Sequence, residues 1–420
     1  MTSNLLATDF NAFPIDKLVA GEGYVAGATC DLANDVHPLF ARENMQGFDY
    51  DAILPALRLA SHFLTTECLS SYWWAVLWGP YTENEDPDCL CKEYDMAHYS
   101  MRFEEDKLEP EEFADLQRDL RNLAKIVHYS VAELHACGRC ARLEGVTIPA
   151  DVLDPERCYG EPSEITIGNA IHDELMRVKQ LADREGEATG MSEKLAERYL
   201  ELAVSLVHET AHAAATARRG GFPPMPINDR KMAEDGYDWE ESVFGGLPSI
   251  VLDGTMVLTE WPSPTLHASY AAKGGLWFCG KITDPISRYW RIPGSWTRQL
   301  FQTAFWRDVV PVKGSAALRP PKILGYRHFP QTCQCIVCRN IGPNGSRDEH
   351  GAMMEGSDEA CSAAIVNYMG GPLCADDGDS YAGVPEGYVV LVDGSVVLER
   401  LQGLFEKPAL LRRDVGAKAL

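Results

Sequence analysis

The sequence lacks an excess of positive charge, because 38 Lys and Arg stand against 62 Asp and Glu and give a formal net charge of −24. A chain without a net positive field has little with which to displace counterions from phosphates, which argues against nucleic acid as a partner. The same deficit argues against binding to an anionic membrane surface.

The sequence also lacks long apolar runs. No segment reaches the length of about 18 uninterrupted apolar residues that a membrane span requires. The nearest, 53–78, is interrupted by Arg58, His62 and Glu67, which predicts a buried helix or a helix pair. The N-terminus has neither the basic start nor the apolar run of an export signal. Together with an odd number of cysteines, 13, this favours reduced thiols and a cytoplasmic protein.

Several motifs of common enzyme classes are missing as well. We find no nucleophile elbow and no phosphate-binding Walker sequence, which argues against a serine hydrolase and against a nucleotide-binding protein. The acidic stretch 376–379 lacks the EF-hand spacing and closing Glu, which indicates a solvated turn. A thiol cluster at Cys333, Cys335 and Cys338 has CxxC spacing but no neat fourth ligand. This pattern favours free thiols, with a structural metal or redox chemistry left open.

Periodicity and punctuation predict a mixture of helices and strands. The clearest helix runs from about Ser192 to Arg219 and ends at Gly220 and Gly221, with two prolines just beyond. Other helices are expected over 110–137, 170–184 and 229–244, a strand over 164–168, and a strand pair over 388–398.

The clearest helix contains the motif His208-Glu209-Thr210-Ala211-His212, which is HExxH. Residues four apart share one face of a helix, so both imidazoles can bind one metal ion with Glu209 beside them. Two neutral imidazoles and a carboxylate suit zinc and leave one position for water, whose proton the glutamate takes. The alternative, a hydrogen-bonded His–Glu cluster of the core, leaves a costly buried charge to be paired.

A third ligand is sought on the expected helix over 229–244. On a helical projection Glu240 is the one acid that shares the face of Ala233, Gly236 and Tyr237, so we expect it to point inward and bind the metal. Glu234 is the next candidate, followed by Glu241 and His267. Gly236 lets the two helices approach each other closely.

These two elements together resemble the gluzincin arrangement of zinc metallopeptidases, in which a later helix adds a glutamate ligand to HExxH. The stretch over 233–246 and the Trp- and Pro-rich segment over 290–306 resemble zincin-like proteins of fungi. The resemblance covers about 160–330 and implies that His208, His212 and Glu240 bind zinc while Glu209 is the general base. One departure is visible: gluzincins of the thermolysin type have an acid four residues after the ligand glutamate, where this chain has Phe244. Asp253 is then expected to orient the first histidine instead.

Peptide hydrolysis also needs a hydrogen-bond donor for the developing oxyanion. Tyr237, His267 and Tyr270 are candidates by residue type. The acids Glu234, Asp235, Asp238 and Glu241 flank Glu240 in the sequence; if they line the mouth of a cleft, substrates should be neutral or basic.

The sequence therefore predicts an α+β fold with a zincin-like core, in which a small sheet covers the buried HExxH helix. We expect a mainly helical region over 1–160, the metal-binding core over 161–330 and an extension of short strands and loops over 331–420, although one compact unit fits equally well. The expected activity is a zinc-dependent hydrolase, a metallopeptidase acting on a peptide or small amide. The alternatives are a zincin-like binding protein with a structural zinc and a metal-assisted enzyme for a small metabolite.

Overall fold

The computed structural model describes most of the chain between residues 30 and 328 and two short strands beyond. The described ranges are 30–82, 98–99, 108–133, 145–149, 162–184, 191–219, 227, 234–250, 256–262, 287–322, 325–328, 388–390 and 396–398. Within them the fold mixes helices with two small four-stranded sheets, as expected for the α+β class.

The helices of the described ranges are mostly short, with one long exception. They are α3 (Tyr50–Thr65), α4 (Ser70–Leu77), α5 (Pro110–Leu123), α6 (Asn169–Arg184), α7 (Glu193–Arg219), α8 (Asp235–Phe244), α10 (Gly294–Gln299) and α11 (Val310–Lys313). Single turns of 3₁₀ helix lie at Pro38–Phe40, Arg42–Asn44, Glu67–Leu69 and Gly314–Leu318, and a π-helical turn lies at Phe305–Val309.

The first sheet has the strand order β1-β4-β6-β5. Its strands are β1 (Met45–Gln46), β4 (Val127–Ala132), β6 (Ser163–Gly168) and β5 (Gly145–Pro149). The strands β1, β4 and β6 are parallel, whereas β5 runs antiparallel to β6 at one edge. β5 and β6 pack against α7.

The second sheet is an antiparallel meander with the order β10-β9-β8-β7. Its strands are β7 (Leu247–Ile250), β8 (Met256–Thr259), β9 (Ser287–Arg291) and β10 (Gly325–His328). Two hairpin-like pairs stand apart from both sheets: β2 (Tyr81–Thr82) with β3 (His98–Tyr99), and β11 (Tyr388–Val390) with β12 (Val396–Leu398). The last pair matches the strand pair expected over 388–398.

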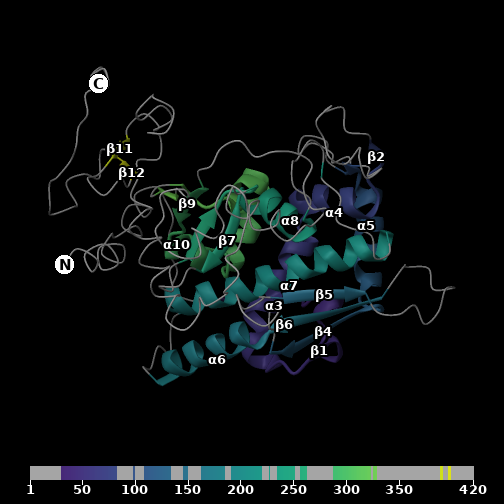
Figure 1. Ribbon diagram of the computed structural model, residues 1–420, viewed down its shortest axis with the longest axis horizontal. Helices are drawn as coiled ribbons and strands as arrows, with labels where there is room; N and C mark the ends of the chain where they lie inside the picture. Colours follow the sequence, from purple (N-terminus) through teal and green to yellow (C-terminus); the bar gives the residue numbers. More distant parts are fainter. Residues whose placement is uncertain are drawn as a thin grey trace, which may run out of the picture.

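The 27-residue helix α7 runs through the middle of the molecule (Figure 1). It contacts α3, α4, α6, α8 and α10 as well as strands of both sheets. Such all-round packing requires a helix that is apolar on nearly every face, and Leu202, Ala203, Leu206 and Val207 are all 0 % exposed. The first sheet lies on one side of α7, and α8 with the second sheet lies on the other (Figure 1).

The predicted helix over 110–137 is wrong in its second half. α5 begins as expected, with Pro110 in its first turn and a capping box between Glu109 and Glu112. It ends at Leu123, and the chain turns into β4, where Val127 and Tyr129 are buried and His128 is exposed. This period of two and the β-branched and aromatic residues favour a strand over a longer helix.

The remaining expected elements agree more closely. The segment 53–78 forms the helix pair α3 and α4, and α6, α7 and β6 lie within a residue or two of their expected bounds. One hydrophobic cluster extends from Leu32 to Leu318 and so includes residues on both sides of the boundary expected near 160. The division into three regions stays a prediction.

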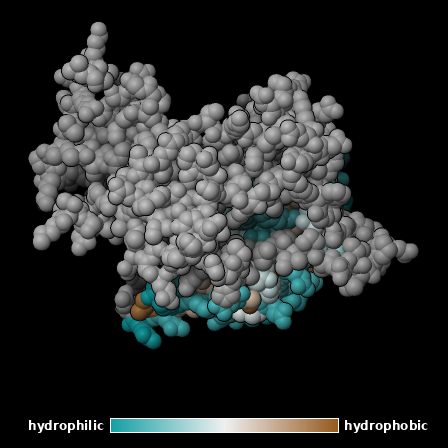
Figure 2. Space-filling view, viewed as in Figure 1, coloured by the Kyte–Doolittle hydropathy of each residue, from teal (hydrophilic) through white to brown (hydrophobic). Residues whose placement is uncertain are grey.

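The described surface at the lower edge of the molecule, where α6 lies, is largely hydrophilic (Figure 2). Leu181 and Val312 are the exposed large hydrophobic residues of the described ranges. Within these ranges no helix combines the length and the apolar character needed to cross a membrane.

Candidate metal centre

Two helices bring the candidate ligands together, and glycine lets them approach. His208 and His212 lie one turn apart on α7, with side chains 15 % and 21 % exposed, so a ligand can reach them from solvent. A Cβ built on Gly236 of α8 would lie 2.3 Å from the His208 ring. Only a residue without a side chain fits this contact, as expected from the sequence.

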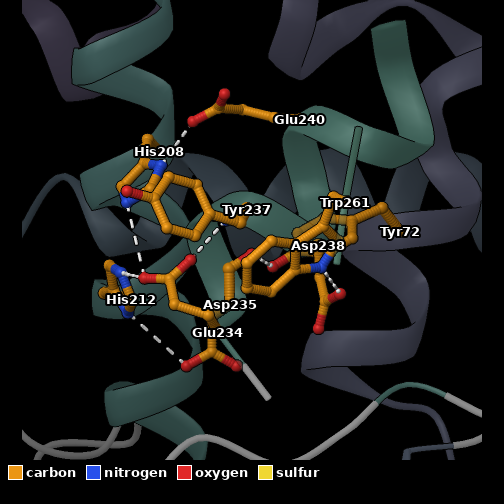
Figure 3. Close-up of polar contacts among 9 residues, drawn as sticks. All are labelled: Tyr72, His208, His212, Glu234, Asp235, Tyr237, Asp238, Glu240 and Trp261. Atoms are coloured by element: carbon orange, nitrogen blue, oxygen red, sulfur yellow. Dashed lines mark hydrogen bonds and ion pairs between the residues drawn. The ribbon is translucent and has the colours of Figure 1, made fainter. Parts of the chain in front are cut away.

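Helix α8 begins later than expected, and this changes which acid faces the histidines. Glu234 is the N-cap of α8 and accepts a hydrogen bond from the backbone N–H of Tyr237 through Oε2. Its other oxygen, Oε1, lies 2.5 Å from Nε2 of His212 and 3.5 Å from Nε2 of His208. Figure 3 shows the Glu234 carboxylate facing both imidazoles.

One nitrogen from each histidine and one oxygen of Glu234 all lie within 4.8 Å of one another. Donors bound at about 2.0–2.1 Å to one tetrahedral ion are roughly 3.3–3.5 Å apart. The distance from His208 to Glu234 already fits this value, and the shorter distance from His212 to Glu234 must lengthen by less than about 1 Å. Two imidazoles and a carboxylate are also the donor set of many catalytic zinc sites.

Glu240 lies at the other nitrogen of His208. Its Oε1 is 2.6 Å from His208 Nδ1, and only 4 % of the residue is exposed. The helical projection was right that Glu240 points inward, but the geometry places Glu234, and not Glu240, at the Nε2 atoms. Glu240 is instead placed to fix the tautomer and orientation of the His208 ring.

His212 has a weaker contact of the same kind. Asp235 Oδ2 lies 3.6 Å from His212 Nδ1, so each histidine has a carboxylate at each of its two nitrogens. Counted from Glu234, the fourth following residue is Asp238, an acid, whereas counting from Glu240 gives Phe244. Asp238 nevertheless accepts a hydrogen bond from Trp261 Nε1 at 2.9 Å, and Glu240 is the acid that contacts His208 Nδ1.

The two histidines and Glu234 form a strongly coupled charge cluster. Burial lowers the pKa of His208, but the facing carboxylates of Glu234 and Glu240 outweigh it and hold this pKa well above 6.5. For His212 burial also acts downward, yet Glu234 and Asp235 raise its pKa to about 10. Burial raises the pKa of Glu234, but the two imidazoles hold it well below its usual range.

Glu209, the expected general base, is buried with 6 % of its surface exposed. Its negative charge contributes to the raised pKa of His212 and to that of Tyr129, a buried residue of β4. Tyr129 in turn is hydrogen-bonded through its hydroxyl to Thr210 Oγ1, at 2.8 Å. Glu209 therefore lies in the electrostatic reach of both the histidines and the first sheet.

Tyr237 lies next to the histidines, as the sequence suggested. Its ring packs edge-on against the His208 ring, with centroids 4.9 Å apart, and its other neighbour is the Trp261 ring at 4.9 Å. Tyr237 is half-buried, whereas Trp261 is 7 % exposed. The other proposed donors, His267 and Tyr270, lie outside the described residues, as do Asp253 and the cysteines at 333–338.

The acids around Glu240 are not a solvated rim. Glu234, Asp235 and Asp238 are 6 %, 3 % and 0 % exposed, and only Glu241 is half-buried. Glu234 caps α8 and faces the histidines, whereas Asp238 accepts a hydrogen bond from the Trp261 indole. Because these carboxylates are engaged inside the protein, they give no support for a preference for basic substrates.

Sequence reasoning missed one residue that reaches this centre. Tyr72 and Trp73 lie in the segment 53–78, which was expected to form a buried helix or helix pair, and they are 1 % and 0 % exposed. Yet the Tyr72 hydroxyl donates a hydrogen bond to the backbone carbonyl oxygen of Asp235, at 2.5 Å, across 163 residues of sequence. Nothing in the local sequence signals such a long-range contact.

No family model, curated protein or solved structure matches this chain. The case for a function therefore depends on the geometry of the centre.

Proposed function

We propose that this protein is a zinc-dependent hydrolase, most simply a metallopeptidase. The observation that carries the proposal is the meeting of His208, His212 and Glu234 around one point, with Glu209 buried next to the first histidine. The resemblance to gluzincins also implies two histidines and a glutamate as ligands, but it implies Glu240, whereas we propose Glu234 because its carboxylate faces both Nε2 atoms.

The number of protein donors supports an enzyme over a purely structural zinc. Structural zinc sites usually close their shell with four protein ligands, whereas catalytic sites use three and keep one position open. In the part of the chain that the structure describes, three donors meet. The histidine side chains also keep some access to solvent, which a substrate requires.

Each residue has a role in this proposal. Zinc, when bound, would act as a Lewis acid and lower the pKa of a water molecule. Glu209 would accept the proton of that water and pass it to the leaving amine. Glu240 and Asp235 would hold the two imidazoles by Nδ1, so that Nε2 faces the ion. Tyr237, packed on His208, is the described candidate for donating a hydrogen bond to the oxyanion.

An edge strand favours a peptide as the substrate. β5 forms one edge of the first sheet and contacts α7, the helix that carries HExxH. The backbone groups of an edge strand can pair with an extended peptide, which would then lie along the sheet next to α7. A small metabolite would have no use for such an edge.

The proposal is tested with the purified full-length chain. Metal analysis should find about one zinc per chain, and a peptide-library digest should show cleavage that chelation removes. Glu209→Gln should keep the zinc and lose at least about 100-fold in kcat/KM, because it removes the base and leaves the ligands. Zinc without any cleavage would favour the binding protein, and full activity in Glu209→Gln would refute the mechanism.

A further inference from the structure

The two ligand-bearing helices, α7 and α8, pack directly against each other, and a third helix, α4, is hydrogen-bonded to both. α7 supplies both histidines and α8 supplies Glu234, so the metal geometry depends on how α8 sits against α7. Metal–ligand distances tolerate a spread of only about 0.2 Å, so a small shift of α8 would misplace the carboxylate. The contacts that hold α8 should therefore contribute to metal affinity alongside the ligands.

On one side α4 is tied to α7. Arg218, in the last turn of α7, donates hydrogen bonds to the carbonyl oxygens of Ala75, Val76 and Gly79 at the end of α4, at 3.0, 3.1 and 2.6 Å. The two helices also pack against each other. Hydrogen bonds from a charged guanidinium are stronger than neutral ones, so this link fixes α4 relative to the HExxH helix.

On the other side α4 is tied to α8. The Tyr72 hydroxyl donates to the carbonyl oxygen of Asp235, the first residue of α8 and the direct neighbour of Glu234 (Figure 3). The contact is almost entirely buried, with Tyr72 1 % and Asp235 3 % exposed, so water cannot replace the lost partner. The Tyr72 ring is itself fixed by edge-on packing against Trp73, with centroids 5.2 Å apart.

We propose that Tyr72 is a positioning residue of the metal centre, which acts through the backbone of α8 to place the Glu234 carboxylate opposite the two histidines. This inference rests on the proposed metal site. It goes beyond it because the Tyr72 hydroxyl bonds to the backbone of Asp235 rather than to a ligand side chain, and Tyr72 belongs to a helix that the HExxH motif does not predict.

The test compares Tyr72→Phe with a matched variant, using Zn²⁺ as the probe. Tyr199→Phe is the control: Tyr199 is 3 % exposed and its hydroxyl donates to the carbonyl oxygen of Ala52 at 3.0 Å, but that bond joins α7 to α3. Both variants lose one hydroxyl-to-carbonyl hydrogen bond. Zn²⁺ affinity of the full-length chain is measured by competition with a chelator of known affinity.

Tyr72→Phe should bind Zn²⁺ about tenfold more weakly than the wild type, at the lower end of the range for residues that orient ligands. Tyr199→Phe should remain within about twofold, although both metal-free variants should lose a similar amount of stability in urea. The visible spectrum of the Co²⁺-loaded protein should change in Tyr72→Phe and not in Tyr199→Phe, because only the first alters the coordination geometry.

A second variant tests the same link if Tyr72→Phe fails to fold. Arg218→Gln loosens the other end of α4, so it should also weaken Zn²⁺ binding, and its effect should not add to that of Tyr72→Phe. Equal Zn²⁺ affinities for Tyr72→Phe and Tyr199→Phe would overturn the inference and leave the proposed hydrolase intact. A wild-type chain that binds no Zn²⁺ would overturn both.

Discussion

Two buried glutamates of this protein have pKa values shifted in opposite directions. Glu234 faces two imidazoles, which hold its pKa far below the usual range despite burial. Glu197, on the N-terminal half of α7, is 8 % exposed, and burial together with the nearby charge of Glu193 raises its pKa to about 8. Arg291, Arg198 and Lys194 oppose this rise without cancelling it.

The difference shows what a buried acid indicates about function. Removing a carboxylate from water favours the neutral form unless opposite charges or hydrogen bonds compensate. Glu197 follows this default: burial favours its neutral form, so its position indicates packing in the core rather than a role in binding an ion. Glu234 departs from it because the histidines supply the compensation, and such a grouping is what a metal site requires.

The largest expected effect separates the ligand Glu234 from the orienting residue Glu240. Glu234→Ala should weaken Zn²⁺ binding by well over 100-fold, because it removes a donor. Glu240→Ala should weaken it by about 10- to 100-fold, because it only frees the His208 ring. Chelator competition on both variants measures the two affinities.

Glu197→Ala is the control for this pair, since it removes a buried glutamate on α7 that lies away from the histidines. Its Zn²⁺ affinity should stay within about twofold of the wild type. If Glu240→Ala lost more affinity than Glu234→Ala, the assignment of the ligand would have to be reversed.

A smaller loss of Zn²⁺ affinity, together with a loss of stability, is expected for a substitution at Gly236. In Gly236→Ala the new Cβ would overlap the His208 ring, so α8 or the ring must move at a cost of about 1–3 kcal/mol in stability. Zn²⁺ affinity should fall as well, because Glu234 and His208 move apart. Thermal unfolding with and without Zn²⁺ checks both.

Gly314→Ala controls for the loss of a glycine as such. Its φ of 63° makes alanine strained, yet no atom lies within 4 Å of the added Cβ. It should lose about 1 kcal/mol of stability and no Zn²⁺ affinity. A Gly236→Ala protein that binds Zn²⁺ as well as the wild type would show that the helices are not as close as described.

An effect on stability alone, with Zn²⁺ affinity almost unchanged, concerns Glu197 and the dependence of stability on pH. Its pKa is higher in the folded chain than in the unfolded one, so folding takes up a proton between the two values. The stabilising contribution is complete below the unfolded pKa and is lost as pH rises towards about 8.

Glu197→Gln keeps the shape of the neutral acid and cannot ionise. Between pH 5 and 7 the wild type should lose up to about 1.4 kcal/mol per pH unit relative to this variant. Urea unfolding of the metal-free proteins at several pH values gives the difference. Parallel curves for the two proteins would mean that Glu197 is ionised in the folded state.

Much of the fold could be predicted from the sequence where the signal is local. The apolar surface of α7, its termination at two glycines and the period of α6 are visible in short windows. The end of α5 was misplaced because Leu123 is followed by a turn and then by alternating residues, which a continuing helical pattern obscures. The order of the strands in the sheets depends on pairings between distant segments and has no local signal.

The candidate site was predicted in the same uneven way. His208, Glu209 and His212 follow from one motif on one helix. The choice between Glu234 and Glu240 depended on where α8 begins: a helix assumed to start at 229 turns Glu234 away from the histidines, whereas Glu234 is the N-cap of α8 and faces them. The preference of acids for helix N-termini favours Glu234 as a cap, and could have located the start of α8. Tyr72 could not have been found.

The length of α7 has a consequence for how this protein can change. Glu197 and Glu209 are twelve residues apart, which is about 18 Å along a helix and beyond the roughly 7–10 Å within which substitutions usually couple. Substitutions at the two ends of α7 should therefore combine independently. Stabilising substitutions near Glu197 should therefore leave the chemistry at Glu209 unchanged.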